Sequence, residues 1–287
     1  MPELPEVEAL ARFLAEEAVG KKVGRVEVHA ISALKTFDPP VDALVGHVLA
    51  GTDRRGKFLL LDFEGIVLAI HLSRSGWVQW RDQITAKPGR GPKRGPMALR
   101  VKFSDGSGFD VTEQATEKRL QVHVVSKPEE VESIATQGPD PLSAALDGAA
   151  FAALLAGRKQ QIKGVLTDQH VLAGVGNAYS DEALHLANLS PFKHASTLTP
   201  DEVRTLYRSL REVLTDAVER SLGLPAKGLK AEKKSGMRVH GRVGEKCPEC
   251  GDIVREVSFA TSSLQYCATC QTGGKPLADR RLSRLLK

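Results

Sequence analysis

The chain opens with Met1-Pro2-Glu3-Leu4-Pro5-Glu6-Val7-Glu8, a stretch that predicts the start of an amphipathic helix. Apolar residues at positions 7, 10, 11, 14 and 18 share one face of a helix with about 3.6 residues per turn. Prolines are favoured in a first helical turn, where their missing N–H group is not needed. The N-terminus should therefore form a helix that buries one face against a core.

The same stretch has a second, chemical interpretation. A small residue after Met1 normally allows the initiator methionine to be removed, which would leave Pro2 with a secondary amine. An α-amino group has a pKa of roughly 8, and the positive end of a helix dipole lowers it further. A neutral amine can attack a carbonyl-like carbon and form an iminium, with the Glu3 carboxylate beside it as acid or base. On these residues alone, a simple helix start is the favoured interpretation.

Length and composition limit the possible classes of protein. A chain of 287 residues with 41% hydrophobic residues should fold into about two domains with real cores. The sequence contains neither a secretory signal pattern nor an apolar run of membrane-spanning length, so we expect a soluble, cytoplasmic protein without a membrane partner. We also expect a monomer. The net charge of +5 weakly indicates a polyanionic partner.

After the first helix, residues 1–130 have the pattern of a β-rich domain. Glu64-Gly65 predicts a hairpin turn, and Ser104-Asp105-Gly106 predicts another. Strands in this number with one helix predict a two-sheet sandwich or barrel. Residues 82–96 predict a basic loop, for which DNA contact and a solvated insertion are equally supported. The predicted strands are residues 22–28, 44–51, 57–63, 66–72, 77–80, 98–103, 108–111 and 119–125.

A polar segment at 131–147 predicts the linker to a helical domain at 148–240. Helices are predicted at 160–168 and 177–187, and Thr199-Pro200-Asp201-Glu202 has the form of a capping box that starts a long helix. Gly174 and Gly176 in the turn before Asn177 would let the backbone approach a phosphate, with helix N–H groups pointing at it. By spacing alone, an ordinary helical hairpin is the favoured alternative.

Four cysteines form the most specific local signal and define a third region, residues 241–287. Two Cys-x-x-Cys pairs at this separation fit a four-thiolate site for one structural zinc ion, and residues 253–257 and 264–266 can form a hairpin between them. A redox dithiol is the weaker alternative. The ligands are Cys247, Cys250, Cys267 and Cys270.

Taken together and in this order, these pieces resemble the formamidopyrimidine-DNA glycosylase and endonuclease VIII family over essentially the full length. The resemblance implies an α+β, multidomain fold: an N-terminal β-sandwich with an N-terminal helix, a helix–two-turn–helix domain and a four-cysteine zinc finger, with double-stranded damaged DNA between the domains. Besides the N-terminus and the cysteines, the matching motifs are Arg55-Gly56-Lys57, His71-Leu72-Ser73-Arg74-Ser75-Gly76, Gln161-Ile162-Lys163, Ala173-Gly174-Val175-Gly176-Asn177-Ala178-Tyr179 and Asp181-Glu182-Ala183-Leu184.

The resemblance also implies roles for single residues. Pro2 would attack the sugar C1′ of a flipped nucleotide and expel the base, and Glu3 would protonate the sugar-ring oxygen. Elimination from the iminium would then cut the strand on both sides of the sugar. Lys57 would assist at this catalytic site by holding phosphate, and His71, which its position alone marks as a structural histidine, would face DNA. The other residues implied at the DNA are Glu6, Arg74, Lys118, Arg119, Leu120, Lys163, Gly174, Gly176, Asn177 and Ser262.

Departures from the family pattern fall on the residues that fill the vacated base stack and clamp the DNA. Arg74 stands where the family often has methionine, and Leu120 stands where a phenylalanine wedge is usual. Ser262 replaces an arginine that grips phosphate, and residues 223–239 are shorter than the flap that covers oxidised purines. We therefore expect cleavage of abasic sites and weak or absent action on 8-oxoguanine opposite cytosine, with oxidised pyrimidines or ring-opened lesions as further substrates.

Two other functions are alternatives to a bifunctional glycosylase and abasic-site lyase. One is a protein of the same fold that binds abasic or distorted DNA with little base excision, which the serine at position 262 favours. The other is a zinc-ribbon protein acting on RNA or protein, which only the positive charge supports.

Overall fold

The computed structural model describes residues 1–84, 96–259 and 262–278, so most of the predicted basic loop at 82–96 and the C-terminal tail lie outside it. The chain divides into two compact units. Unit 1 is Met1–Thr136 with Ser221–Lys230, and unit 2 is Gln137–Arg220 with Ala231–Lys287. The sequence predicted domains at 1–130 and 148–240, but residues 221–230 belong to the first unit rather than to the helical one.

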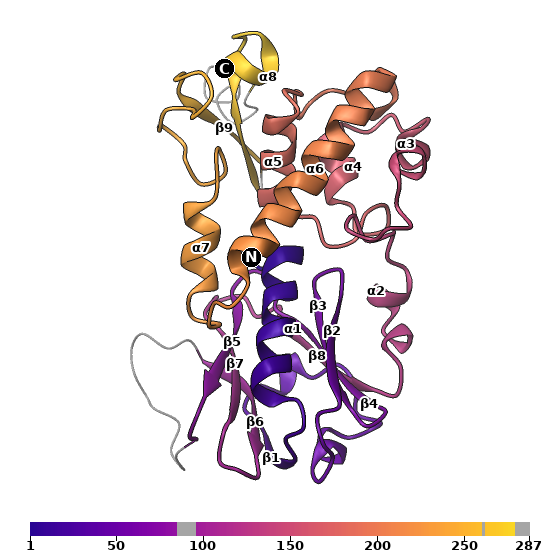
Figure 1. The fold of residues 1–287 in the computed structure, drawn as a ribbon, viewed down its shortest axis with the longest axis vertical. Helices are drawn as coiled ribbons and strands as arrows, with labels where there is room; N and C mark the ends of the chain where they lie inside the picture. The colour runs from indigo at the N-terminus through magenta and orange to yellow at the C-terminus, as the bar shows by residue number, and fades with distance from the viewer. Residues whose placement is uncertain (85–95, 260–261, 279–287) are drawn as a thin grey trace. The chain divides into compact units, whose positions relative to one another are not determined.

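Unit 1 is the predicted sandwich of two antiparallel sheets beside one long helix (Figure 1). The helix is α1, Leu4–Ala18. The sheets have the strand orders β1-β6-β7-β5 and β2-β3-β4-β8. The strands are β1 Val23–Val28, β2 Gly51–Arg55, β3 Phe58–Phe63, β4 Ile66–His71, β5 Gly76–Arg81, β6 Met97–Phe103, β7 Gly108–Glu113 and β8 Gln121–Val125. Short helices are η1 Ile31–Ala33, η2 Val41–Leu44, η3 Pro128–Glu130 and α2 Glu132–Ala135.

The core of unit 1 lies under the apolar face predicted for the first helix. Val7, Leu10 and Leu14 are fully buried there, together with strand residues such as Leu61 and Val111. Burial of aliphatic side chains of this size contributes roughly 1.5–3 kcal/mol each. The sandwich is therefore stabilised where α1 packs on it, and α1 in turn fixes the position of the residues at its N-terminus.

The strand predicted at residues 44–51 is not formed. Residues Val41–Leu44 form a 3-10 helix instead, and the next strand begins at Gly51. Gly46 has a φ of 91°, a left-handed conformation that does not continue a strand. The backbone of 46–49 bonds to residues 21–23, with Leu49 N–H donating to Lys21 O at 3.0 Å. This apolar segment is therefore a loop that pairs with the residues just after the C-terminal end of α1.

Residues 221–230 join unit 1 although they follow the long helix of unit 2. Ala226 and Leu229 are buried in the same core cluster as the strands. The Trp77 indole N–H donates to the Ala226 carbonyl at 3.0 Å, and the Lys230 ammonium lies 4.6 Å from the centre of a Trp77 ring. This segment is therefore anchored on strand β5.

Unit 2 contains the predicted helices. Thr199 and Glu202 form the predicted capping box, because each side chain accepts the other's backbone N–H, at 3.3 and 2.8 Å. Between residues 223 and 239 the structure has a helix that the sequence pattern did not predict, α7 at Leu229–Ser235; its first two residues belong to unit 1 and the rest to unit 2. The other helices of the unit are α3 Gly148–Leu155, α4 Ile162–Thr167, α5 Asn177–Leu186, η4 Ala195–Thr197 and α6 Pro200–Ser221.

The cysteine-rich end of unit 2 is the predicted hairpin followed by a short helix. Strand β9, Val254–Ser258, pairs antiparallel with β10, Ser263–Cys267, and α8 spans Ala268–Thr272. Among the described residues, none of the helices is both long and apolar enough to cross a membrane.

Candidate functional site

The start of α1 holds Pro2 and Glu3 in a fixed, buried arrangement. Both residues are buried, with Glu3 only 2% exposed, whereas Met1 lies at the surface. Glu3 is the N-cap, and its backbone N–H donates to Glu6 Oε2 at 2.8 Å. In return the Glu3 side chain accepts the backbone N–H of Glu6. This reciprocal pair fixes the Glu3 carboxylate beside Pro2 and gives Glu6 a supporting position.

Lys57 is buried in the same unit, at the tight turn before β3. Its exposure is 8%, so the ordinary expectation of a solvated lysine is wrong here. The turn depends on Gly56, whose φ is 54°. Arg54 reaches the Gly56 carbonyl with Nη1 at 3.3 Å and Glu8 Oε2 of α1 with Nε at 3.0 Å. Arg54 therefore connects the helix that carries Pro2 to the turn that carries Lys57.

Glu8 remains a carboxylate partner for this connection. Burial raises its pKa, but hydrogen bonds from Arg12 and the charge of Arg54 outweigh burial and hold the pKa below its ordinary value. Arg54 is almost entirely buried, with 8% of its side chain exposed. A buried guanidinium needs such a paired carboxylate, so this ion pair is a fixed part of the fold.

His71 ends strand β4 next to this turn. Its ring packs against Phe58, the residue opposite it in strand β3, with the ring centres 4.8 Å apart and the planes tilted by 46°. Burial, and then the nearby charges of Lys57 and His123, lower the pKa of His71 to about 4, so the ring is neutral at pH 7. Its Nδ1 atom is buried without a hydrogen-bond partner among the described residues. His71 is thus a neutral ring packed beside Phe58, and its contact with DNA stays a prediction.

Leu120 does not lie where the family resemblance placed it. It is 1% exposed and belongs to the sandwich core, and a buried core residue cannot insert between base pairs. The backbone N–H groups of Arg119 and Leu120 donate to the buried Glu113 carboxylate at 2.8 and 3.0 Å, which points Leu120 inward. The interpretation of Leu120 as a DNA wedge is therefore corrected.

The charged residues around Leu120 remain at the surface. Lys118 is exposed and donates to the Glu113 carbonyl at 2.8 Å. Arg119 is exposed and pairs with Glu117 at 2.7 Å. Arg74 is exposed and follows Ser73, a non-glycine residue with a φ of 53°. These three charged side chains, rather than Leu120, are exposed in this region, so a DNA duplex could reach them.

In unit 2, the predicted glycines Gly174 and Gly176 lie in the turn between α4 and α5. Gly174 has a φ of 84°, and its N–H donates to Gln169 Oε1 at 2.9 Å. Gly176 is the N-cap of α5, and Asn177 is the first residue of that helix. The Asn177 side-chain amide donates to the Ser263 carbonyl of strand β10. The turn is thus tied directly to the hairpin between the cysteine pairs.

Lys163 of α4 points under this turn instead of into solvent. Its ammonium donates to Asp181 Oδ1 at 2.6 Å, to Ser180 Oγ at 2.8 Å and to the Asn177 carbonyl at 3.1 Å. An ammonium group has three donors, and these three acceptors use all of them. Lys163 therefore acts on the N-terminal turn of α5.

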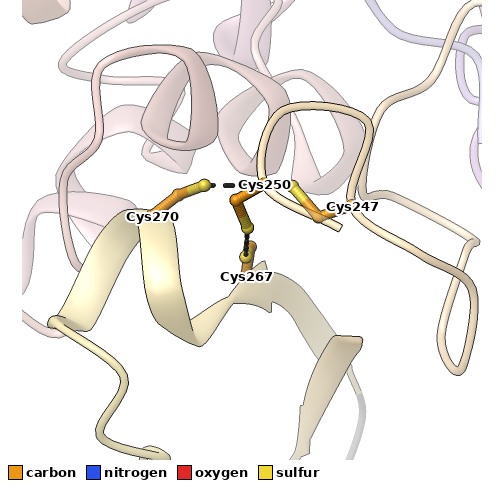
Figure 2. Close-up of side chains that lie close together, drawn as sticks. All are labelled: Cys247, Cys250, Cys267 and Cys270. Atoms are coloured by element: carbon orange, nitrogen blue, oxygen red, sulfur yellow. Dashed lines mark hydrogen bonds between the residues drawn. The ribbon is translucent and has the colours of Figure 1, made fainter. Parts of the chain in front are cut away.

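The four cysteines come together as a metal site (Figure 2). Their sulfur atoms lie within 4.8 Å of one another, with 3.9 Å from Cys247 to Cys270 and 3.4 Å from Cys250 to Cys267. Four thiolates around a tetrahedral zinc ion at about 2.3 Å lie roughly 3.8 Å apart, so the arrangement fits one structural zinc. His185 of α5 places Nε2 at 3.2 Å from Cys247 Sγ, a contact that orients this ligand.

The structure gathers the predicted residues within each unit. Pro2, Glu3, Glu6, Lys57, His71, Arg74 and 118–120 belong to unit 1, and Lys163, Gly174, Gly176, Asn177, Ser262 and the cysteines belong to unit 2. Ser262 is exposed next to β10, and its carbonyl accepts the Phe259 N–H at 2.7 Å. The sequence assigned no role to Arg54, to Glu113 or, within its matching motif, to Asp181, because their partners are distant in the sequence.

Comparisons with known proteins agree with these features. The N-terminal domain of formamidopyrimidine-DNA glycosylase matches residues 1–120, and its H2TH domain matches residues 137–225. A zinc finger found in FPG and IleRS matches residues 244–273, around the four cysteines.

Three relatives show how far the similarity extends. A formamidopyrimidine-DNA glycosylase of Symbiobacterium thermophilum is 35% identical over 98% of this chain and 93% of its own length. A formamidopyrimidine-DNA glycosylase-like protein of Mycobacterium tuberculosis is 59% identical over 52% of this chain and 94% of its own. The structure of a Lactococcus lactis formamidopyrimidine-DNA glycosylase bound non-covalently to DNA with an abasic site superposes with a TM-score of 0.81, at 27% identity over 94% of this chain and 99% of its own.

Proposed function

Since this chain belongs to the formamidopyrimidine-DNA glycosylase family, we propose that it is a DNA-repair glycosylase that also cleaves the strand at abasic sites through the amine of Pro2. The observation that carries the proposal is the start of α1. There Pro2 and Glu3 are buried together, and the capping pair with Glu6 fixes the Glu3 carboxylate. Zinc has a structural role in this proposal and takes no part in the reaction.

The proposed reaction begins once Met1 is removed and Pro2 carries a free secondary amine. With a pKa of roughly 8 or lower, part of this amine is neutral at pH 7. Its lone pair attacks C1′ of the damaged nucleotide, the C1′–base bond breaks, and the base leaves with a proton. Glu3 donates a proton to the ring oxygen O4′, so that the sugar opens as O4′ leaves C1′ and an iminium forms.

The iminium then draws electrons out of the sugar. Loss of a proton from C2′ breaks the bond from C3′ to its phosphate oxygen, and loss of a second proton, from C4′, breaks the bond from C5′ to its phosphate oxygen. Water finally hydrolyses the iminium and restores the Pro2 amine. The strand is left with a one-nucleotide gap that has phosphates on both sides.

On the side of DNA binding, we assign phosphate contacts to Lys57 in unit 1 and to the turn of Gly174, Gly176 and Asn177 in unit 2. Glycines without side chains let a phosphate reach the backbone N–H groups at the start of α5. Arg74 and Arg119 are exposed and are the proposed fillers of the space that a flipped nucleotide vacates, because a guanidinium plane can stack on bases. The proposed substrate is duplex DNA bound by one copy of the chain.

Abasic sites are the proposed preferred lesion. An abasic nucleotide has no base to unstack or recognise, so it needs little wedge or flap. Residues 221–230 are anchored on the sandwich through Trp77 and Leu229, which leaves little free chain to cover a purine. Ser262 is exposed near the hairpin end, and a serine cannot make the two parallel hydrogen bonds that an arginine gives to phosphate.

Single-turnover cleavage on matched duplexes tests this proposal. We expect strand cleavage at an abasic site and at least a 100-fold slower reaction at 8-oxoguanine opposite cytosine. Comparable rates on the two lesions would refute the proposed preference. Tight binding to abasic DNA without any cleavage would instead support the second candidate, a lesion-binding protein, which the serine at position 262 favours.

A further inference from the structure

Asp181 of helix α5 is a buried carboxylate at which three separate segments of unit 2 meet. Its side chain is 0% exposed, and its Oδ1 accepts the Lys163 ammonium of α4 at 2.6 Å. Its Oδ2 lies 2.8 Å from the ring Nδ1 of His240 and 3.2 Å from the backbone nitrogen of Gln265 in strand β10. A buried charge is costly unless it is fully paired, so an arrangement with this many partners resists displacement.

Asn177 holds the same strand from the same face of α5. It precedes Asp181 by four residues, which places both side chains one above the other on the helix. Asn177 donates to the Ser263 carbonyl, while Asp181 accepts the N–H of Gln265, two residues further along β10. The first turn of α5 and the hairpin between the cysteine pairs are therefore joined at two neighbouring points.

We propose that Asp181 is a positioning residue for DNA binding, and that Lys163 acts through it and not by direct contact with a phosphate. Lys163 and Asp181 together fix the start of α5 against β10, so that the backbone of the turn at 174–177 and the hairpin form one rigid surface. This inference rests on the proposed function, because it assigns a role within the proposed DNA contact.

The variant Asp181→Asn distinguishes a positioning role from direct electrostatic attraction, because the two predict opposite changes in affinity for abasic-site DNA. Asparagine has nearly the same shape but removes one negative charge and releases the Lys163 ammonium. If Lys163 served DNA as a free cation, the variant would bind abasic-site DNA more tightly and its salt dependence would steepen by about 0.9 in the log–log slope. The positioning role predicts about 10-fold weaker binding with an unchanged slope.

The matched control is Asp201→Asn, which makes the same charge change at an exposed position of α6, where 81% of the aspartate side chain is accessible. Its affinity should stay within twofold of wild type. Ser180→Ala removes a second acceptor of Lys163 without touching Asp181, and it should weaken binding two- to threefold. Circular dichroism and zinc content establish that each variant is folded. Should Asp181→Asn not fold, Ser180→Ala decides alone.

A second measurement needs no DNA and keeps this proposal distinct from the proposed function. In the zinc-loaded full chain, Asp181→Asn should release zinc to a chelator at least fivefold faster than wild type, because β10 ends at Cys267. Failure of wild type to bind abasic DNA would refute the proposed function, and the zinc measurement would still test whether Asp181 fixes β10. Tighter DNA binding by Asp181→Asn, unchanged binding by Ser180→Ala, or wild-type zinc release by Asp181→Asn would each overturn the positioning role.

Discussion

Truncation of Leu120 to alanine should destabilise the protein without removing a DNA wedge. Leu120 is 1% exposed in the core cluster of unit 1. Leucine-to-alanine changes at such positions cost about 2–5 kcal/mol, because the lost burial adds to the cost of a cavity. With a central value of about 3 kcal/mol, a unit of this size should melt roughly 6–12 °C lower.

Calorimetry and single-turnover kinetics on abasic DNA, both well below the melting transition, measure the two effects separately. The matched control is Arg119→Ala. Because Arg119 is exposed, this substitution should change the free energy of unfolding by no more than about 0.5 kcal/mol. We expect Leu120→Ala to melt earlier and to cleave within threefold of wild type. A variant that melted like wild type but cleaved abasic DNA more than tenfold slower would refute the assignment of Leu120 to the core.

Three further predictions follow from buried groups. The pKa of His71 is about 4 in the folded protein and about 6.5 in the unfolded chain, so its contribution to stability is present above pH 6.5 and is lost as the pH falls toward about 4. Urea unfolding should give a free energy of unfolding roughly 2 kcal/mol lower at pH 5 than at pH 7, and His71→Gln should lack this decrease. Cys250→Ser should lose zinc in a metal assay and bind abasic DNA more weakly than wild type. Equal binding by metal-free and zinc-loaded protein would contradict a structural role for the zinc finger. Arg54→Gln should lower the free energy of unfolding in urea by about 1.5–3 kcal/mol, because it breaks the charge-assisted hydrogen bond to Glu8. An unchanged urea midpoint would show that this ion pair does not stabilise the fold.

Local sequence patterns predicted those parts of the fold that depend on neighbouring residues. Glu64 and Gly65 both adopt positive φ values, of 57° and 94°, as a two-residue hairpin turn requires. The Thr199 capping box and the hairpin between the cysteine pairs are likewise short-range. The apolar run at 44–51 failed as a strand because Gly46 turns the chain, and apolar content alone does not distinguish a packed loop from a strand.

Other features depend on contacts between distant residues and could not be predicted from local patterns. The anchoring of residues 221–230 requires Trp77, about 150 residues earlier in the chain. Resemblance to a family placed Leu120 by position, but its burial follows from Glu113, which turns its backbone inward. Lysines are ordinarily exposed, and the burial of Lys57 follows from the turn that Arg54 holds. Asp181 stood in a matched motif, yet its partners became visible only in three dimensions.

Trapping of a covalent intermediate on abasic-site DNA with borohydride tests the central claim most directly, because only an imine between protein and sugar is reduced to a stable bond. The account predicts a cross-linked complex that maps by mass spectrometry to Pro2, with the yield lost in Pro2→Gly and in protein that retains Met1. No complex from wild type on any abasic substrate, or a complex of equal yield that maps to another residue in both variants, would contradict it.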